Sequence, residues 1–347
     1  MTGPRRDIGD EQRGLIELVQ AARPNLSPIG KDTEQWLDRL EERHDALHAL
    51  VDERLRAEPQ AGADLAATLW RFWWLRGHMA EGHAFLERAV VIESPERQEV
   101  LKGLGTIAFR EGDAETADRA FNERLRLLER ENDPRKLADA FADLARVALR
   151  RGDFAAVGNY AERGYAVAQG LGPDAIRAPL HLRAAAARME GRLDEARALY
   201  LESRAINEQL GNQGNVAVED HNLMYVALHS GDRAEAERRF RSSSEWIFSH
   251  SNAYLRPYAL LDAGVLALHD GELERACRLI AATQQIFDET GSIPDPDDRV
   301  ELDNAVADLR KQLGERFADL WQAGKTLSLE QAQALARRAS QPAVPGD

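Results

Sequence analysis

Glycine recurs in this sequence at intervals of 35 to 40 residues, each time between two stretches with helical periodicity. Most of these glycines have a small residue four positions before them, a small residue five positions after them and a larger apolar residue nine positions after them. Small residues allow two antiparallel helices to approach closely, so the pattern predicts helical hairpins, and repetition at this period is typical of a solenoid. The turn glycines are Gly77, Gly112, Gly152, Gly191, Gly231 and Gly271.

The repeats define the expected domain organisation. We expect an all-α fold, a right-handed superhelical solenoid of hairpins with a period of about 40 residues, in which six hairpins occupy 63–291. An N-terminal helical segment over 11–62 precedes them. Capping helices over 292–338 follow them, because the last hairpin has an apolar face to cover. The polar ends, 1–10 and 339–347, are expected to be disordered.

Charge and cysteine content exclude several classes of function. The formal net charge of −14 disfavours nucleic acids and membrane surfaces as general partners. The single cysteine, Cys277, cannot form an internal disulfide, which is typical of a reducing compartment. We find neither a secretory signal nor an apolar run long enough to span a membrane. The expected location is cytoplasmic, and we expect no membrane contact.

Prolines and capping residues predict the helix boundaries near the N-terminus. Pro24 and Pro28 should interrupt a first helix over 11–22, because proline lacks the donor that a helix interior needs. A second helix should start near Asp32, with Gln35 as its capping-box partner, and continue past residue 50.

Similar signals follow the last hairpin. Asp295 should cap a further helix, with Pro296 in its first turn, and this helix should run to about Ala323. Ser328 should cap a last short helix and form a capping box with Gln331.

Two N-terminal segments resemble the start of one particular tetratricopeptide (TPR) region. They are WLDRLEERHDAL at 36–47 and LWRFWWLRGHMAEGHAFLERA at 69–89. The region is the C-terminal part of bacterial regulators of the LuxR, AfsR and NB-ARC ATPase type. A closing segment with Phe317, Trp321 and Gly324 is also similar to it, so that the resemblance covers about residues 11–338. It implies TPR-like repeats that sense an inducer or a partner protein.

The chain departs from these regulators in lacking their nucleotide-binding domain. Gly324-Lys325-Thr326 is not a phosphate-binding loop, because Asp319 stands where the first glycine of that loop must be. No helix-turn-helix module remains once the repeats are assigned. We therefore expect neither a nucleotide cofactor nor direct DNA binding.

In TPR folds the first helix of each pair lines a concave groove, and the resemblance places the groove positions 13, 10, 6, 3 and 2 residues before each turn glycine. Acids occur there only at the outermost position, as Asp64, Glu99 and Asp139. The other positions are rich in basic and aromatic residues, which predicts a groove for an acidic peptide, a carboxylate or another anion. Alternatively, the arginines pair with acids of neighbouring repeats and bind nothing. The candidate groove residues are Arg71, Trp74, Lys102, Arg110, Arg146, Arg150, His181, Arg188, His221, Tyr225, His229, Tyr258 and His269.

The leading functional hypothesis is a protein-interaction or effector-sensing module in bacterial signalling or transcriptional regulation, with an acidic protein or peptide partner. The alternative is a cavity ringed by groove residues, which binds an anionic metabolite, with or without transforming it. A third hypothesis is a scaffold or homo-oligomer that uses its convex face. The oligomeric state is open.

Other chemistries have weaker support. His44 and His48 are spaced to present two metal ligands, but two ligands are too few, and we expect no metal. No nucleophile motif occurs, so we expect no catalytic residue and no enzyme activity. The groove histidines are expected to be neutral hydrogen-bonding groups.

Overall fold

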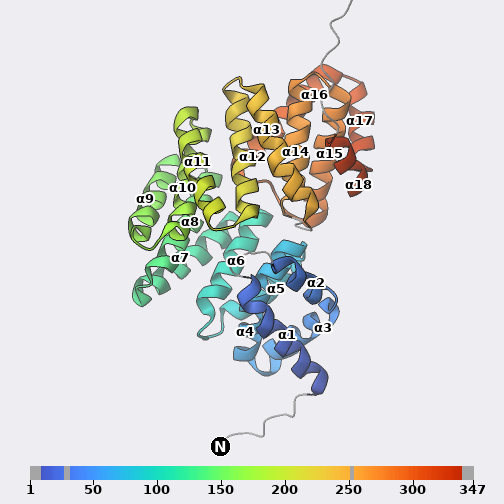
Figure 1. Cartoon of the computed structure of the whole chain (residues 1–347). Coiled ribbons are helices and arrows are strands. Elements are labelled where there is room, and N and C mark those ends of the chain that lie inside the picture. The colour runs from blue at the N-terminus through green and yellow to red at the C-terminus, as the bar shows by residue number, and fades with distance from the viewer. Residues whose placement is uncertain (1–8, 27–31, 251–253, 338–347) are drawn as a thin grey trace, which may run out of the picture. The chain divides into compact units, whose positions relative to one another are not determined.

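The computed structural model describes residues 9–26, 32–250 and 254–337, which form eighteen α-helices and no β-strand (Figure 1). This confirms the predicted all-α class. The chain divides into two compact units, the first of Met1–Phe109 and Asp113–Leu127 and the second of Arg110–Gly112 and Leu128–Asp347. None of the described helices is long and apolar enough to cross a membrane.

The first unit contains five complete helices and most of two more, which share one hydrophobic core that includes Val19, Leu40, Trp70 and Leu86. These helices are α1 (Asp10–Leu26), α2 (Thr33–Glu41), α3 (His44–Ala57), α4 (Pro59–Arg76), α5 (Met79–Val90), α6 (Arg97–Glu111) and α7 (Ala114–Glu131).

The second unit contains the remaining helices. Consecutive helices pack as hairpins, α8 with α9, α10 with α11, α12 with α13 and α14 with α15. The helices are α8 (Pro134–Arg150), α9 (Phe154–Ala168), α10 (Pro173–Met189), α11 (Leu193–Gln209), α12 (Gln213–His229), α13 (Arg233–Ser249), α14 (Arg256–His269), α15 (Leu273–Thr290), α16 (Pro296–Leu313), α17 (Arg316–Lys325) and α18 (Leu329–Ala336).

The six turn glycines end the first helix of each hairpin as the sequence predicts. All six have φ between 69° and 86°, the left-handed region that favours glycine. The N–H of the residue after each glycine donates to the carbonyl four positions before that glycine, at 2.8 to 3.0 Å. This hydrogen bond closes the helix end, which explains why the glycine recurs at this place in every hairpin.

The predicted close approach of the paired helices is also confirmed. The residues four before, five after and nine after the turn glycines are all buried. Gly82 shows the size matching most clearly, because a Cβ at this position would lie 2.8 Å from the Cβ of Trp73. The first hairpin therefore combines a large residue before the turn with a glycine after it, where later hairpins combine two smaller residues.

The N-terminal boundaries differ from prediction. Pro24 lies inside the last turn of α1, which continues to Leu26, because the burial of Leu26 in the core offsets the one helical hydrogen bond that the proline removes. Asp32 precedes α2 but makes no capping bond, since its backbone is helical rather than extended. The expected single long helix is broken at 42–43 into α2 and α3. Pro28 lies outside the described residues.

The C-terminal boundaries are partly as predicted. Ser328 and Gln331 form both bonds of the capping box of α18, and Pro296 occupies the first turn of α16. Asp295 precedes α16, but its side chain does not cap it. The helix expected to reach residue 323 is interrupted at Gly314, whose φ is 55°. The expected disordered ends lie outside the described residues, except for positions 9 and 10 and the start of α1 at Asp10.

Candidate functional site

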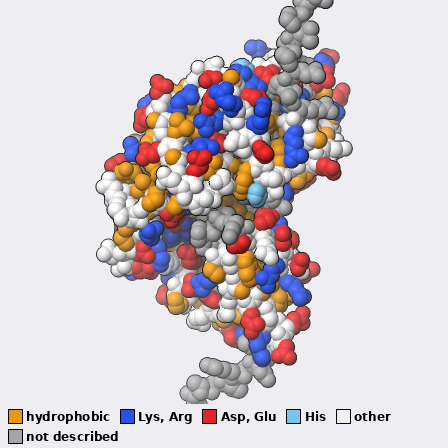
Figure 2. All heavy atoms as spheres, in the orientation of Figure 1, with side chains coloured by type: hydrophobic (Ala, Val, Ile, Leu, Met, Phe, Trp, Pro, Cys, Tyr) orange, Lys and Arg blue, Asp and Glu red, His pale blue; other side chains and the backbone are white. Residues whose placement is uncertain are grey.

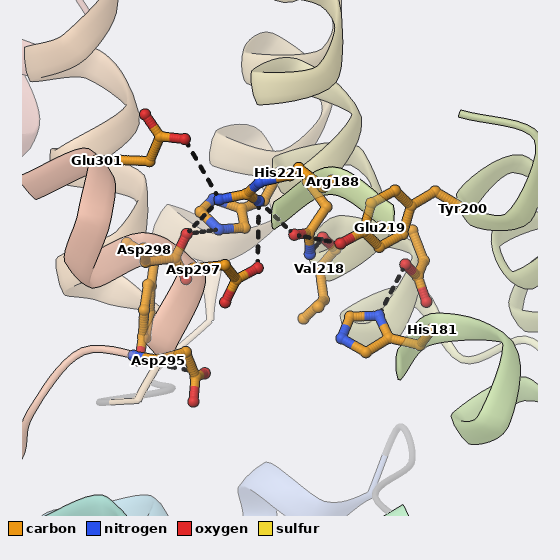
Figure 3. A network of polar contacts seen from close by, with 12 residues as sticks. His181, Arg188, Tyr200, Val218, Glu219, His221, Asp295, Asp297, Asp298 and Glu301 are labelled. Carbon is orange, nitrogen blue, oxygen red and sulfur yellow. Dashed lines mark hydrogen bonds and ion pairs between the residues drawn. The ribbon is translucent and has the colours of Figure 1, made fainter. Parts of the chain in front are cut away.

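Three helices of the second unit bring charged side chains together (Figure 3). Helices α10 and α12 supply basic side chains, and α16 supplies the facing carboxylates from its first two turns. We name the basic side chains the cationic cluster, which consists of His181, Arg188, His221 and His229. We name the carboxylates the α16 tip, which consists of Asp297, Asp298 and Glu301.

The apolar face of α16 anchors the part of the helix that follows the tip. Leu302 and Leu309 are buried in a core that also contains Leu261 of α14 and Ile280 of α15. That core starts one residue after the tip, so the first two turns of α16 project their acids toward α10 and α12 while the rest of the helix covers the last hairpin.

Arg188 is the most enclosed cation of the cluster. Its guanidinium has Asp297 at 3.3 Å, Glu301 at 3.5 Å and Asp298 at 3.6 Å. Its Nη1 donates to the Asn222 amide oxygen at 2.7 Å. Burial opposes its charge, but Asp297 and the other carboxylates raise the pKa of Arg188 above its usual value. The cation is therefore permanent and balanced from α16.

His221 contacts a carboxylate with each ring nitrogen. Nδ1 lies 2.9 Å from the Asp262 carboxylate of α14, and Nε2 lies 3.0 Å from Asp298. Burial alone would lower the pKa of His221, but Asp262 and Asp298 raise it well above its usual value. Both nitrogens then donate, which only the imidazolium does. The expectation of a neutral histidine is wrong at this position.

The other two histidines lie at the edges of the cluster. His181 Nδ1 is 3.0 Å from Glu219, which also accepts from the Ser203 hydroxyl at 2.6 Å. Burial opposes the charge of His181, but Glu219 raises its pKa. His229 Nε2 lies 3.3 Å from Glu301, and 41% of its side chain is exposed. His229 is therefore the cluster member that solvent reaches most easily.

Two buried tyrosines pack against Arg188. The hydroxyl of Tyr200 donates to the Asn222 amide oxygen at 3.1 Å, and the ring of Tyr225 lies 4.8 Å from the guanidinium. Burial raises the pKa of both hydroxyls well above their usual value, so both stay protonated. In the part of the chain that the structure describes, the buried Tyr225 hydroxyl has no hydrogen-bond partner.

Asp295, just before α16, binds within the second unit instead of capping the helix. The Tyr254 hydroxyl donates to it at 2.6 Å, and the Arg110 guanidinium also donates to it. Burial would raise the pKa of Asp295, but Arg110 lowers it below its usual range. Its N–H donates to the Tyr258 hydroxyl at 3.2 Å. A carboxylate engaged by an arginine and a tyrosine is not available to the free amides of the helix end.

The structure brings some predicted groove residues together and separates others. His181, Arg188, His221, Tyr225 and His229 converge around the α16 tip. Arg110 and Tyr258 contact Asp295. Arg146 of α8 pairs with Asp143 at 3.1 Å, Arg150 ends α8, and His269 lies beside Asp270. Arg71, Trp74 and Lys102 belong to the first unit, where Arg71 packs on the Trp70 ring.

The acids were missed by the sequence analysis. The interpretation that acids occupy only the outermost groove positions is wrong for this cluster, because each of its cations faces a carboxylate. Asp143, Asn222 and Asp262 stand nine residues before their turn glycines, at a position that the assumed groove register omitted. Polar residues inside otherwise apolar helices were the available signal.

Charge on the visible surface is mixed. Figure 2 shows acidic and basic side chains interspersed on one face of the described chain. Among the described residues, no group of three or more His, Cys, Asp or Glu side chains is arranged to hold a metal ion. His44 and His48 both contact Glu81 instead. Cys277 is buried, and burial raises the pKa of its thiol to about 11.

Solved structures of helical-repeat proteins are similar to this chain. A Rap protein complexed with competence and sporulation factor has a TM-score of 0.55 at 14% identity, over 89% of this chain and 90% of that chain. The apo form of RapI has a TM-score of 0.49 at 12% identity, over 93% and 96%. Nearly identical TPR-like repeats from Podosopora anserina have a TM-score of 0.46 at 18% identity, over 59% and 100%.

No protein-family model and no curated protein matches the sequence. At these identities the structural likeness shows the fold alone. The chain is a TPR-like helical repeat protein, and the 18 helices of the described residues pack as sequential hairpins.

Proposed function

We propose that this TPR-like protein binds a protein or peptide partner, and that an acidic segment of the partner is recognised by the cationic cluster. The observation that carries the proposal is the seating of the α16 tip. Arg188 and His221 hold carboxylates that lie one helical turn apart on a single helix. A surface that holds such a pattern within the chain has the chemistry to hold it on a partner.

The fold supports a binding role. Helical solenoids expose long surfaces that are commonly used for partners. A Rap protein, similar in fold to this chain, has been solved in complex with a competence and sporulation factor. The resemblance of segments 36–47 and 69–89 to the TPR region of LuxR, AfsR and NB-ARC regulators points to bacterial signalling or transcriptional regulation as the setting.

Binding without catalysis fits the chemistry of the cluster better than an enzyme does. A general base needs a lone pair, and both nitrogens of His221 are directed at carboxylates. Burial keeps the hydroxyls of Tyr200 and Tyr225 protonated by raising their pKa. The thiol of Cys277, with its pKa raised to about 11, is a poor nucleophile.

The test is a selection of displayed peptides on the immobilised full chain. We expect the selected peptides to carry clustered Asp and Glu and to lose affinity at high salt, because screening weakens charge pairs. The comparison target is a double variant, His181→Gln with His229→Gln, since these two members of the cluster have partly exposed side chains. Peptides without acidic enrichment, or peptides that bind both targets equally, would contradict the proposal.

A further inference from the structure

The α16 tip has the features of a ligand that the chain carries itself. Its three carboxylates come from a single helix, yet they contact α10 and α12, which belong to earlier hairpins. His221 and Asp298, for example, are 77 residues apart in sequence. A stretch without helix from Ser292 to Asp295 separates α15 from α16.

Charge, rather than apolar packing, holds the tip. Asp297, Asp298 and Glu301 are buried against Arg188, His221 and His229, whereas the apolar core contacts of α16 start at Leu302. The segment between Asp295, which Arg110 and Tyr254 hold, and Leu302, which the core holds, can therefore separate from the cationic cluster while the rest of the helix stays on the last hairpin. Local opening of this kind at a helix end costs less than unfolding the core.

The fit of the tip is also incomplete. A guanidinium and a carboxylate normally form hydrogen bonds of about 2.7–2.9 Å, often two in parallel. Arg188 Nη2 lies 3.5 Å from Glu301 and 3.6 Å from Asp298, and it makes no hydrogen bond in the described part of the chain. The neighbouring Tyr225 hydroxyl also lacks a partner there. Two buried donors are thus left for a better-placed carboxylate.

The tip is also strained by its own charge. Asp297 and Asp298 are adjacent and buried, and like charges in a buried site repel. Burial and Asp298 together raise the pKa of Asp297 to about 6. A ligand whose carboxylates are spaced further apart avoids part of this repulsion.

We infer that the α16 tip is a built-in competitor for the cationic cluster, and that the partner is an acidic helical segment that displaces it. The inference rests on the proposed function. The partner presents two carboxylates one helical turn apart, of which one binds both guanidinium nitrogens of Arg188 and accepts from Tyr225. Until it binds, the tip fills the site at a high effective concentration, as linked segments do.

The experiment uses the segment itself as the probe. A fluorescent peptide of residues 293–305 is titrated into the full chain and into the variant Asp297→Asn, Asp298→Asn, Glu301→Gln. The matched control, Asp303→Asn, Asp308→Asn, Glu315→Gln, removes three exposed acids on α16 and next to it. We expect the tip variant to bind the peptide at least about tenfold more tightly than wild type and control. A peptide with amides at its three tip positions should not bind.

The outcomes separate the two proposals. Equal affinity of wild type, control and tip variant for the peptide would overturn the inference that the tip is a competitor, but it would not contradict the proposed function. Absence of binding by all three would count against both. The tip variant leaves Arg188 and His221 buried without their facing carboxylates, which affects its stability as well as its binding. Hydrogen exchange on the wild type therefore provides a second, independent measurement. Saturating peptide should accelerate exchange at amides 299–302, and unchanged protection there with peptide bound would overturn the competitor.

Discussion

Replacing His221 with glutamine tests the central contact of the candidate site. The imidazolium donates to Asp262 at 2.9 Å and to Asp298 at 3.0 Å, and all three side chains are buried. Glutamine is neutral, and its amide can donate to one of the two carboxylates. The other carboxylate then stays buried without its cation.

The expected cost follows from these contacts. Removing one partner of a buried ion pair typically destabilises a protein by about 3–5 kcal/mol. One hydrogen bond to a charged group, worth about 1.5–3 kcal/mol, can be remade by the glutamine amide. We therefore expect His221→Gln to lower the free energy of unfolding by about 1.5–2 kcal/mol. His229→Gln, at an exposed pair, should cost less than about 1 kcal/mol.

The assay is urea denaturation of a double-mutant cycle with Asp262→Asn, read by circular dichroism. The double variant should lose about 2 kcal/mol less than the sum of the single variants, because its buried carboxylate and its buried cation are removed together. Additive costs, or a cost of His221→Gln as small as that of His229→Gln, would refute the description of His221 as a buried imidazolium between two carboxylates.

The pH dependence provides an independent check. The folded-state pKa of His221 is raised, so its stabilisation is complete below the unfolded-state pKa of about 6.5 and is lost as pH rises through the folded value. Wild-type stability should therefore fall on the alkaline side more steeply than that of His221→Gln. Parallel curves for the two proteins above neutral pH would contradict the charged state.

Three further predictions concern other parts of the structure. The pKa of Asp297 is raised to about 6 from 3.8, so wild-type stability should fall as pH rises through this window, by about 2 kcal/mol relative to Asp297→Asn in paired urea titrations at pH 4 and 7. Gly82→Ala should destabilise the first unit by about 1–3 kcal/mol in thermal unfolding, because its Cβ meets Trp73. Ser328→Ala should cost about 1 kcal/mol and speed hydrogen exchange in α18 alone, because it removes the capping box.

The hairpins could be predicted from sequence because their signals are local. A turn glycine such as Gly231 needs only its own positive φ, and the burial of Ala227 and Ala236 follows from helical spacing around it. Ser328 and Gln331 likewise interact over three residues. The predicted helix boundaries and caps were wrong where a contact between residues distant in sequence determines the local structure. Asp295 has the sequence of a capping residue, but its carboxylate is held by Arg110 and Tyr254.

Only half of the candidate site could be predicted from the sequence, because its other half depends on contacts between residues distant in sequence. The repeat register located Arg188, His221 and His229, since those positions recur with the hairpins. It could not locate their partners in α16, which follows no further turn glycine of the series and whose placement depends on how the hairpins stack. Asp262 was missed although its signal was present, a carboxylate within the buried stretch Leu260–Gly264.

The helix dipole is one explanation for the acids at the start of α16, because it favours negative charge at this end. That explanation accounts for their sign but not for their burial. Exposed carboxylates gain the dipole interaction without desolvation, whereas Asp297 and Asp298 are 7% and 4% exposed. Burying them is unfavourable unless cations compensate, and Arg188 and His221 supply that compensation. Conversely, the tip carboxylates balance the charge of these two buried cations. Each side of the contact thus accounts for the burial of the other, which the dipole and the capping role of α16 do not.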